Sequence, residues 1–186
     1  MRDQPVLQNS CGTCAVCCTA LGFNAKEGYS KKAGETCKHC TGTGCGIYET
    51  RYELCRIFHC GWRKQPLLGE EWRPDVSGVL LMELTGEEIP EDYRAAGAGL
   101  EFMILTDESA ITRPGFADYV ATLVSRKVVV YMSLVGRPKT VLNQFLEELV
   151  AAGDMPGLTR MLVHMYKLHL EAQRMGIEAP DRGAPR

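Results

Sequence analysis

The sequence lacks any long hydrophobic run, because no stretch approaches the roughly 20 consecutive apolar residues that a membrane-spanning helix needs. The first ten residues, MRDQPVLQNS, also lack the apolar core of a secretory signal. Neither sign of charge dominates, since 21 Lys and Arg stand against 23 Asp and Glu, a formal net charge of −2. A chain of this charge does not bind nucleic acid through its overall electrostatic field. We therefore expect a cytoplasmic protein without a membrane partner, and a nucleic-acid partner is disfavoured.

Cysteine is missing from the last 126 of the 186 residues, although the chain contains nine cysteines. All nine lie between Cys11 and Cys60. Charge changes near the same place: residues 1–65 carry nine basic and five acidic side chains, whereas residues 66–186 carry twelve and eighteen. Proline and glycine interrupt regular structure at 65–69. We predict a cysteine-cluster metal-binding module at 1–65, an α+β support region at 66–178 and a flexible tail at 179–186.

The cysteine pattern favours a metal site over disulfide bonds. A disulfide framework needs an oxidising compartment, for which we see no export signal, and an odd number of cysteines leaves one unpaired. The spacing is C-x2-C-x2-C-C, followed by a second C-x2-C pair and three further cysteines. Two cysteines separated by two residues let one tight turn direct both sulfur atoms at one ion. The candidate metal ligands are Cys11, Cys14, Cys17, Cys18, Cys37, Cys40, Cys45, Cys55 and Cys60.

The spacing leaves the identity of the metal open. Zinc takes four ligands, so eight of the nine thiols suffice for two closed four-thiolate sites and one thiol is spare. Cys11, Cys14 and Cys17 also reproduce the first three ligands of the bacterial ferredoxin motif, but the Cys-Pro that continues that motif is absent. Zn²⁺ is therefore the leading prediction, ahead of iron or an iron–sulfur cluster, with Cu(I) third because soft thiolates also select it.

The residues between the cysteines are predicted to support the metal rather than to bind it. His39 and His59 each precede a cysteine, and with nine thiols available we expect these histidines to serve as hydrogen-bonding neighbours. Tyr48, Phe58 and Trp62 are expected to form the small apolar core of the module. The basic side chains expected to offset thiolate charge are Lys38, Arg51, Arg56, Arg63 and Lys64.

The motif Cys11-Gly12-Thr13-Cys14-Ala15-Val16-Cys17-Cys18 resembles the signature of the CxxCxxCC family, the YkgJ-type cysteine-cluster proteins. The similarity continues through Cys37-Lys38-His39-Cys40, Gly44-Cys45-Gly46-Ile47-Tyr48, Arg51, Cys55-Arg56, Phe58 and Cys60-Gly61-Trp62. It implies a small bacterial module whose cysteines chelate zinc or iron. The chain departs from the family at Arg51-Tyr52, where relatives commonly have Arg-Pro. That departure affects a local turn and leaves the ligands in place.

The sequence after the cysteines predicts an α+β fold, with a small sheet covered on one face by helices. Apolar runs predict strands at 79–84, 100–105 and 127–135, and helical spacing predicts helices at 116–126, 141–150 and 158–172. In the helix at 141–150, Asn143 and Gln144 are expected to face water. We find no phosphate-binding glycine loop, nucleophile elbow or metalloprotease motif, so catalytic residues stay unknown.

Three functions remain open on these grounds. The leading hypothesis is a cytoplasmic metal-binding protein with a structural or regulatory role, because a closed four-thiolate zinc site has no open coordination position. The second is an iron–sulfur protein that acts as a redox or accessory factor or as a cluster-dependent enzyme. The third is a metal-trafficking or thiol-redox protein. Each of them leaves room for a protein partner.

Overall fold

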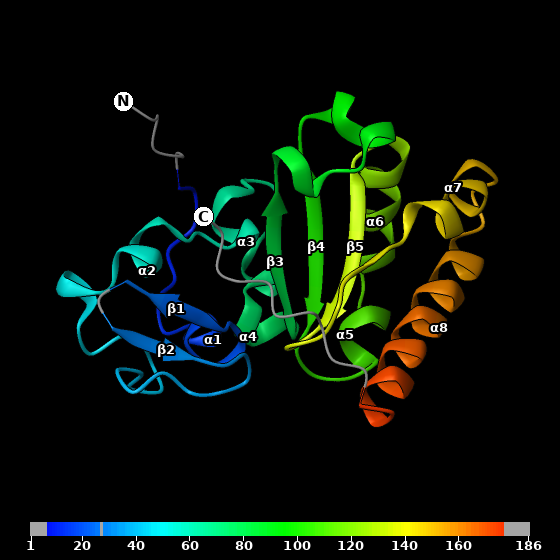
Figure 1. The fold of residues 1–186 in the computed structure, drawn as a ribbon. Helices are drawn as coiled ribbons and strands as arrows, with labels where there is room; N and C mark the ends of the chain where they lie inside the picture. Colours follow the sequence, from blue (N-terminus) through cyan, green and yellow to red (C-terminus); the bar gives the residue numbers. More distant parts are fainter. Residues whose placement is uncertain (1–6, 27, 177–186) are drawn as a thin grey trace.

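The computed structural model describes residues 7–26 and 28–176 and confirms an α+β architecture (Figure 1). Its strands form a two-stranded sheet near the N-terminus and a four-stranded sheet further along the chain. The predicted tail at 179–186 lies outside the described residues. Among the helices of the described part, none is long and apolar enough to cross a membrane.

The cysteine-bearing segment is built from short elements joined by loops. These elements are α1 (Val16–Ala20), β1 (Phe23–Ala25), β2 (Tyr29–Lys31), the 3-10 helix η1 (Tyr48–Thr50), α2 (Glu53–Ile57) and α3 (Gly61–Lys64). Strands β1 and β2 pair antiparallel, with Asn24 opposite Ser30. The longest of these helices, α1 and α2, have five residues each, which is far too short for stability in isolation. The segment therefore depends on contacts between its loops.

The rest of the chain is organised around the sheet β3-β4-β5-β6. Its elements are η2 (Glu70–Trp72), α4 (Pro74–Ser77), β3 (Val79–Leu84), η3 (Gly86–Glu88), η4 (Glu91–Ala96), β4 (Gly99–Ile104), α5 (Ser109–Thr112), α6 (Phe116–Ser125), β5 (Val129–Leu134), β6 (Thr140–Val141), α7 (Asn143–Ala151) and α8 (Met155–Arg174). Strand β4 is antiparallel to β3 and parallel to β5, and β6 is antiparallel to β5. The parallel pair needs a crossover connection, which α5 and α6 provide.

One face of the sheet carries the main core. Leu81, Phe102 and Met132 lie side by side across β3, β4 and β5, and each is at most 1% exposed. The Phe102 ring meets the Phe116 ring of α6 edge-on, with the centroids 5.3 Å apart. Every residue of β4 and β5 is buried, on both faces of the sheet. That double burial explains why these strands are nearly continuous apolar runs in the sequence.

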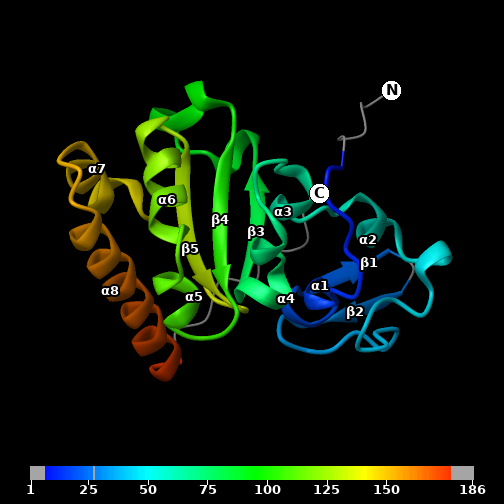
Figure 2. The ribbon, with the colours of Figure 1, turned by 180° about the vertical axis from the view of Figure 1, so that it is seen from behind.

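The cysteine-bearing segment lies beside β3, across the sheet from α7 and α8 (Figures 1 and 2). Helix α3 makes the junction, because a Cβ placed on Gly61 would come within 2.9 Å of the Leu81 Cβ. Trp62 is 1% exposed and belongs to the main core, where its indole N–H donates a 2.9 Å hydrogen bond to the Gly69 carbonyl. The last helix of segment 1–65 is thus packed as part of the core that follows it.

The predicted strands and helices correspond to β3, β4, β5, α6, α7 and α8, with ends shifted by a few residues. The prediction that Asn143 of α7 faces water was wrong, because this residue is completely buried. Its Oδ1 accepts a 2.7 Å hydrogen bond from the Val130 N–H, and its Nδ2 donates a 3.0 Å bond to the Val128 carbonyl. The Asn143 side chain thus continues the pairing of β5 beyond the end of β6.

The prediction of a small aromatic core was wrong for Tyr48, which is 50% exposed and has the Arg51 guanidinium 4.1 Å from its ring centroid. A different aromatic cluster occupies the cysteine-bearing segment. Its members have ring centroids 5.5–6.1 Å apart and are Phe23, Tyr29, His39 and Tyr52. This cluster packs the β1–β2 hairpin against the loops that carry the cysteines.

Candidate metal centre

The nine cysteines are all free thiols, of which Cys37 and Cys60 are buried and the others half-buried. Cys11 and Cys14 precede α1, which itself carries Cys17 and Cys18. Three more thiols lie in the long loop between β2 and η1, one lies on α2, and Cys60 directly precedes α3. Loops and the ends of short elements therefore position nearly all of the candidate ligands.

Four of the thiols form what we call the first thiol group, which consists of Cys11, Cys14, Cys17 and Cys60. A tight turn joins the first two, because the Cys14 N–H donates a 2.9 Å hydrogen bond to the Cys11 carbonyl. Cys17 and Cys60, which are far apart in the sequence, each lie within electrostatic reach of both Cys11 and Cys14. The fold thus brings the last cysteine of the chain back to the first two.

The other five thiols form the second thiol group, which consists of Cys18, Cys37, Cys40, Cys45 and Cys55. Backbone hydrogen bonds of 2.9 Å run from the Cys37 N–H to the Cys18 carbonyl and from the Cys40 N–H to the Cys37 carbonyl. Cys40 and Cys45 form an isolated antiparallel bridge. Cys55 on α2 lies within electrostatic reach of Cys18, Cys37 and Cys45. Three separate parts of the segment contribute to this group.

Cys17 and Cys18 join the two groups. Their neighbouring thiols interact directly, with Cys17 donating a hydrogen bond to the Cys18 sulfur. This hydrogen bond, with burial added, raises the pKa of the Cys17 thiol. The same bond lowers the pKa of Cys18 to about 6, which makes Cys18 the thiolate of the pair. One thiol of the pair therefore keeps its proton while the other offers an anionic sulfur.

Burial dominates the protonation of several other thiols. It raises the pKa of Cys60 to about 11, and it also raises the pKa values of Cys14 and Cys55. In both thiol groups, neighbouring sulfur atoms add repulsion against a second negative charge. A metal ion that binds here must therefore displace protons, since the thiolate is the ligand.

Lys31 is a charge partner that sequence reasoning missed. It is 7% exposed, and its Nζ donates a 2.7 Å hydrogen bond to the Glu35 carbonyl and another to the Leu21 carbonyl. Burial lowers the pKa of this ammonium group, and the nearby Cys37 and Cys18 oppose the decrease. A buried ammonium needs this compensation, because an isolated charge in the interior is costly. Only the folding of the β1–β2 hairpin brings Lys31 to the thiols.

The five basic residues predicted to offset thiolate charge have different roles. Arg51 lies within electrostatic reach of Cys55, and Arg63 within reach of Cys60. Lys64 instead pairs with Glu83 of β3 at 2.8 Å, and Lys38 lies 4.4 Å from the Tyr29 ring centroid. For Arg56, which is exposed on α2, the prediction of a role beside the thiols stays a prediction.

Asp75 is a second residue that sequence reasoning missed. It is the second residue of α4, outside the segment that carries the cysteines, and it interacts with Cys14 through its carboxylate and its backbone N–H. Its carboxylate also accepts a 2.7 Å hydrogen bond from the Arg73 Nε. Burial acts to raise the pKa of the Asp75 carboxyl, but the interactions with Arg73 outweigh it and lower that pKa. Asp75 therefore provides an oxygen atom at the edge of the first thiol group.

The two histidines between the cysteines have other contacts. The His39 Nε2 lies 3.2 Å from the Tyr52 hydroxyl, within the aromatic cluster. The His59 Nδ1 lies 3.4 Å from an Arg63 guanidinium nitrogen, and burial together with that cation lowers the pKa of His59. The hydrogen-bonding neighbour of each histidine ring is thus a tyrosine or an arginine side chain.

The thiols are gathered but not arranged as a finished coordination site. Across residues 7–26 and 28–176, no three His, Cys, Asp or Glu side chains are placed so that they could hold a metal ion. The donors have the right chemistry for a soft metal, and Cys17 and Cys18 are hydrogen-bonded to each other. Closing a site needs side-chain rearrangement within each thiol group.

Comparisons of the chain with protein-family models, with curated proteins and with solved structures found no match. The resemblance to the CxxCxxCC family rests on the cysteine motif and the residues around it, and it stays a prediction.

Proposed function

We propose that this chain is a cytoplasmic metal-binding protein whose cysteines hold zinc, or alternatively iron, in two thiolate centres with a structural or regulatory role. The observation that carries the proposal is the division of the nine thiols into groups of four and five. Four thiols suffice for one tetrahedral zinc site. The first thiol group has that number, and the second has one more, so the spare cysteine belongs to the second group.

The charges around the thiols support this proposal. Four thiolates around one divalent ion leave a net charge of about −2, which needs cations or hydrogen-bond donors nearby. Lys31 faces the second thiol group from the hairpin, and Arg51 approaches it from the loop before α2. Arg63 does the same for Cys60 of the first group. At least one basic side chain thus lies near each proposed centre.

The proposed role of the metal is to cross-link loops that have little other means of staying together. The helices of the segment have at most five residues, and its sheet has two strands of three residues each. In such a segment, the free energy of metal binding becomes free energy of folding. Because the buried thiols must lose protons, affinity rises with pH up to the raised pKa values of Cys14, Cys55 and Cys60.

Membership of the YkgJ-type cysteine-cluster family belongs to the same proposal. It draws on the cysteine spacing and on the residues around the cysteines from Cys11 to Trp62. The family resemblance adds iron as an alternative to zinc. An iron–sulfur cluster is the version of that alternative which gives the chain a redox role.

The test is elemental analysis of protein purified anaerobically without a metal-affinity tag, with acid-labile sulfide measured on the same sample. About two zinc ions per chain without sulfide is the expected result. Iron with a matching amount of sulfide would show that the cysteines hold an iron–sulfur cluster instead of zinc. Absence of metal from the anaerobic sample, followed by oxidation of Cys17 and Cys18 on exposure to air, would overturn the proposal in favour of a thiol-redox function.

Single Cys→Ser variants test the division into two groups. Cys11→Ser or Cys60→Ser removes one of four ligands, so each variant should lose about one metal equivalent. In the second group, one of five thiols is spare, so at least one of Cys18→Ser, Cys37→Ser, Cys40→Ser, Cys45→Ser and Cys55→Ser should keep the full metal content. Loss of metal in all five of these variants would contradict a spare ligand in the second thiol group.

A further inference from the structure

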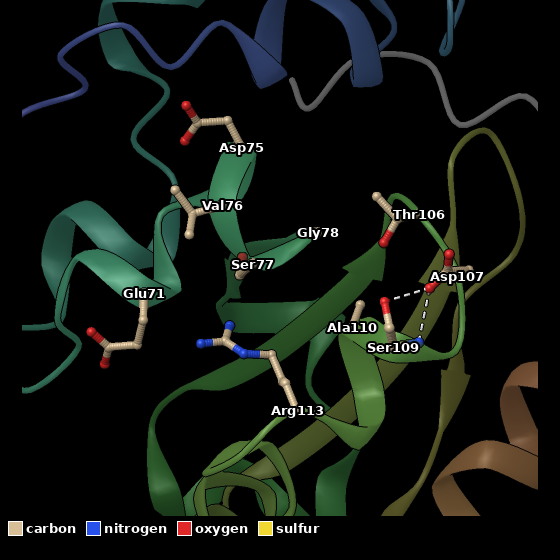
Figure 3. Close-up of a pocket in the computed structure, with 10 residues that line it drawn as sticks. All are labelled: Glu71, Asp75, Val76, Ser77, Gly78, Thr106, Asp107, Ser109, Ala110 and Arg113. Carbon is tan, nitrogen blue, oxygen red and sulfur yellow. Dashed lines mark hydrogen bonds between the residues drawn. The ribbon is translucent and has the colours of Figure 1, made fainter.

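A cavity of about 440 Å³ opens between α4, the loop after β4 and α5 (Figure 3). It lies at the carboxyl end of β4, which pairs with β5 as a parallel strand. Ligands of parallel sheets commonly bind at the carboxyl ends of the strands. The volume is within the range of small-molecule sites. None of the nine cysteines lines this cavity, although Asp75, which does line it, also interacts with Cys14 of the first thiol group.

Arg113 is the cation of the cavity, and its guanidinium is incompletely paired. The Nη1 atom is buried and has no hydrogen-bond partner among the described residues. The guanidinium carbon lies 4.6 Å from the centroid of the Trp72 ring, which holds the group in a fixed orientation. Burial lowers the pKa of Arg113, an effect that nearby Glu71 opposes. A buried N–H group without an acceptor is costly, so an anionic ligand that accepts from the Arg113 guanidinium would relieve an existing penalty.

The acidic side chains of the cavity limit which anion fits. Glu71, Asp75 and Asp107 line the same cavity as Arg113, so the wall carries more negative than positive charge. Asp75 is held by Arg73 at 2.7 Å, and Asp107 accepts hydrogen bonds from the Ser109 N–H and hydroxyl at 2.9 and 2.5 Å. A dianion such as phosphate would be repelled by this wall. A ligand with one carboxylate and one ammonium group matches both signs of charge.

The positions of the charges agree with such a ligand. Figure 3 shows Arg113 and Asp107 rising from different walls of the cavity, with the guanidinium directed toward Ser77 and the Asp107 carboxylate beside Ser109. Ala110 lies on the side of the cavity between these polar groups, and Val76 adds apolar surface near Ser77. We propose that the cavity binds a small zwitterionic amino acid, with its carboxylate on Arg113 and its ammonium group facing Asp107. The two proposed contacts, to Arg113 and Asp107, involve none of the nine cysteines.

The experiment is a thermal-shift screen of the full chain against the individual L-amino acids at millimolar concentration, with inorganic phosphate as a comparison. Each hit is then titrated by calorimetry beside two analogues, one without the carboxylate and one without the amino group. We expect at least one amino acid to bind with one site per chain. Each analogue should bind at least about tenfold more weakly, because each lacks a charge-assisted contact.

Two arginine variants locate the site. Arg113→Gln should weaken binding at least about tenfold, whereas Arg126→Gln, which changes an exposed arginine after α6, should leave the affinity unchanged. Arg113→Lys keeps the positive charge and serves where Arg113→Gln fails to fold; it should retain part of the affinity. Failure of every amino acid to bind, binding of phosphate alone, or unchanged affinity in a folded Arg113→Gln variant would overturn the proposal. Metal content plays no part in these outcomes.

Discussion

The cysteine-bearing segment and the sheet region of this chain are ordered by different physical means. The sheet region has two central strands in which every residue is buried, and it has α8 of twenty residues. The cysteine-bearing segment has helices of at most five residues, and only two of its nine thiols are buried. Apolar burial accounts for the order of the sheet region. The cysteine-bearing segment depends instead on polar contacts and on cross-links between its loops.

The two regions nevertheless touch at defined places. Helix α3 packs Gly61 against Leu81, and Trp62 enters the main core. At a second place, a Cβ on Gly136 would come within 3.4 Å of the Ala33 Cβ. We expect the sheet region to stay folded when the loops loosen, with α3 still attached to it through Trp62 in the main core. That difference is open to four tests.

The largest expected effect comes from metal removal, and it rests on the proposed metal centres. Structural zinc sites contribute on the order of 10–16 kcal/mol of apparent binding free energy, so a chelator should unfold the loops that carry the cysteines. Hydrogen exchange followed by mass spectrometry should show protection lost at residues 37–60 and kept in β5. Equal loss of protection in both regions, or no change in either, would contradict the view that the two regions are ordered by different physical means.

A substitution in the sheet core should have the next largest effect. Phe102→Ala removes a ring that is 1% exposed and contacts Phe116, so we expect a loss of about 3–5 kcal/mol in the free energy of unfolding. Chemical denaturation measures it. The matched control is Phe145→Ala, because Phe145 is 39% exposed and should cost less than about 1 kcal/mol. Equal losses in the two variants would show that burial does not dominate here.

Asn143 tests a single buried polar contact. Asn143→Ala leaves the Val130 N–H and the Val128 carbonyl without their partner, which should cost about 1–3 kcal/mol of stability. The neighbouring Gln144 is exposed, so Gln144→Ala should change stability by no more than about 0.5 kcal/mol. Thermal unfolding of both variants provides the measurement. A neutral Asn143→Ala would mean that water replaces the side chain.

The smallest expected effect is a pH dependence from His169 on α8. Burial lowers the pKa of His169 below its ordinary value of 6.5, and its Nε2 has no hydrogen-bond partner in the described part of the chain. The unfolded chain therefore takes up a proton more readily than the folded one, and stability decreases as the pH falls below about 6.5. His169→Phe should flatten this decrease between about pH 7 and 5, as followed by denaturation at each pH.

The control for this pH effect is His164→Asn, because His164 lies on the same helix and is exposed. Its replacement should leave the pH dependence of stability as it is in the unaltered chain. If the His169 variant keeps the full decrease, other groups are responsible for it.

Several features of the fold follow directly from the sequence. The apolar runs at 79–84 and 127–135 predicted β3 and β5, because strands buried on both faces leave few polar positions in the sequence. The prediction for Asn143 was wrong for a complementary reason. Helical spacing places it on the polar side of α7, and only the neighbouring β5, with its free backbone groups, makes burial favourable.

The candidate site, too, could be predicted from the sequence only in part. The cysteine spacing pointed to nine candidate ligands, but it could not divide them into groups, because Cys60 reaches Cys11 and Cys14 only through the fold. Asp75 carried no signal, since it acts at Cys14, which is distant in the sequence. Lys31 lies closer to Cys37 in the sequence, but nothing in the spacing shows that its ammonium group is buried beside the thiols.

The sequence by itself determined the α+β class, the three long strands and three long helices of the sheet region, and the pool of candidate thiol ligands, because periodicity and local spacing encode these features. The tertiary structure alone decided which thiols are neighbours, which charges are buried beside them, and that the Arg113 Nη1 is left without a hydrogen-bond partner among the described residues. Desolvation and electrostatic interactions between side chains depend on distances in space, and those distances are set only when the chain is packed.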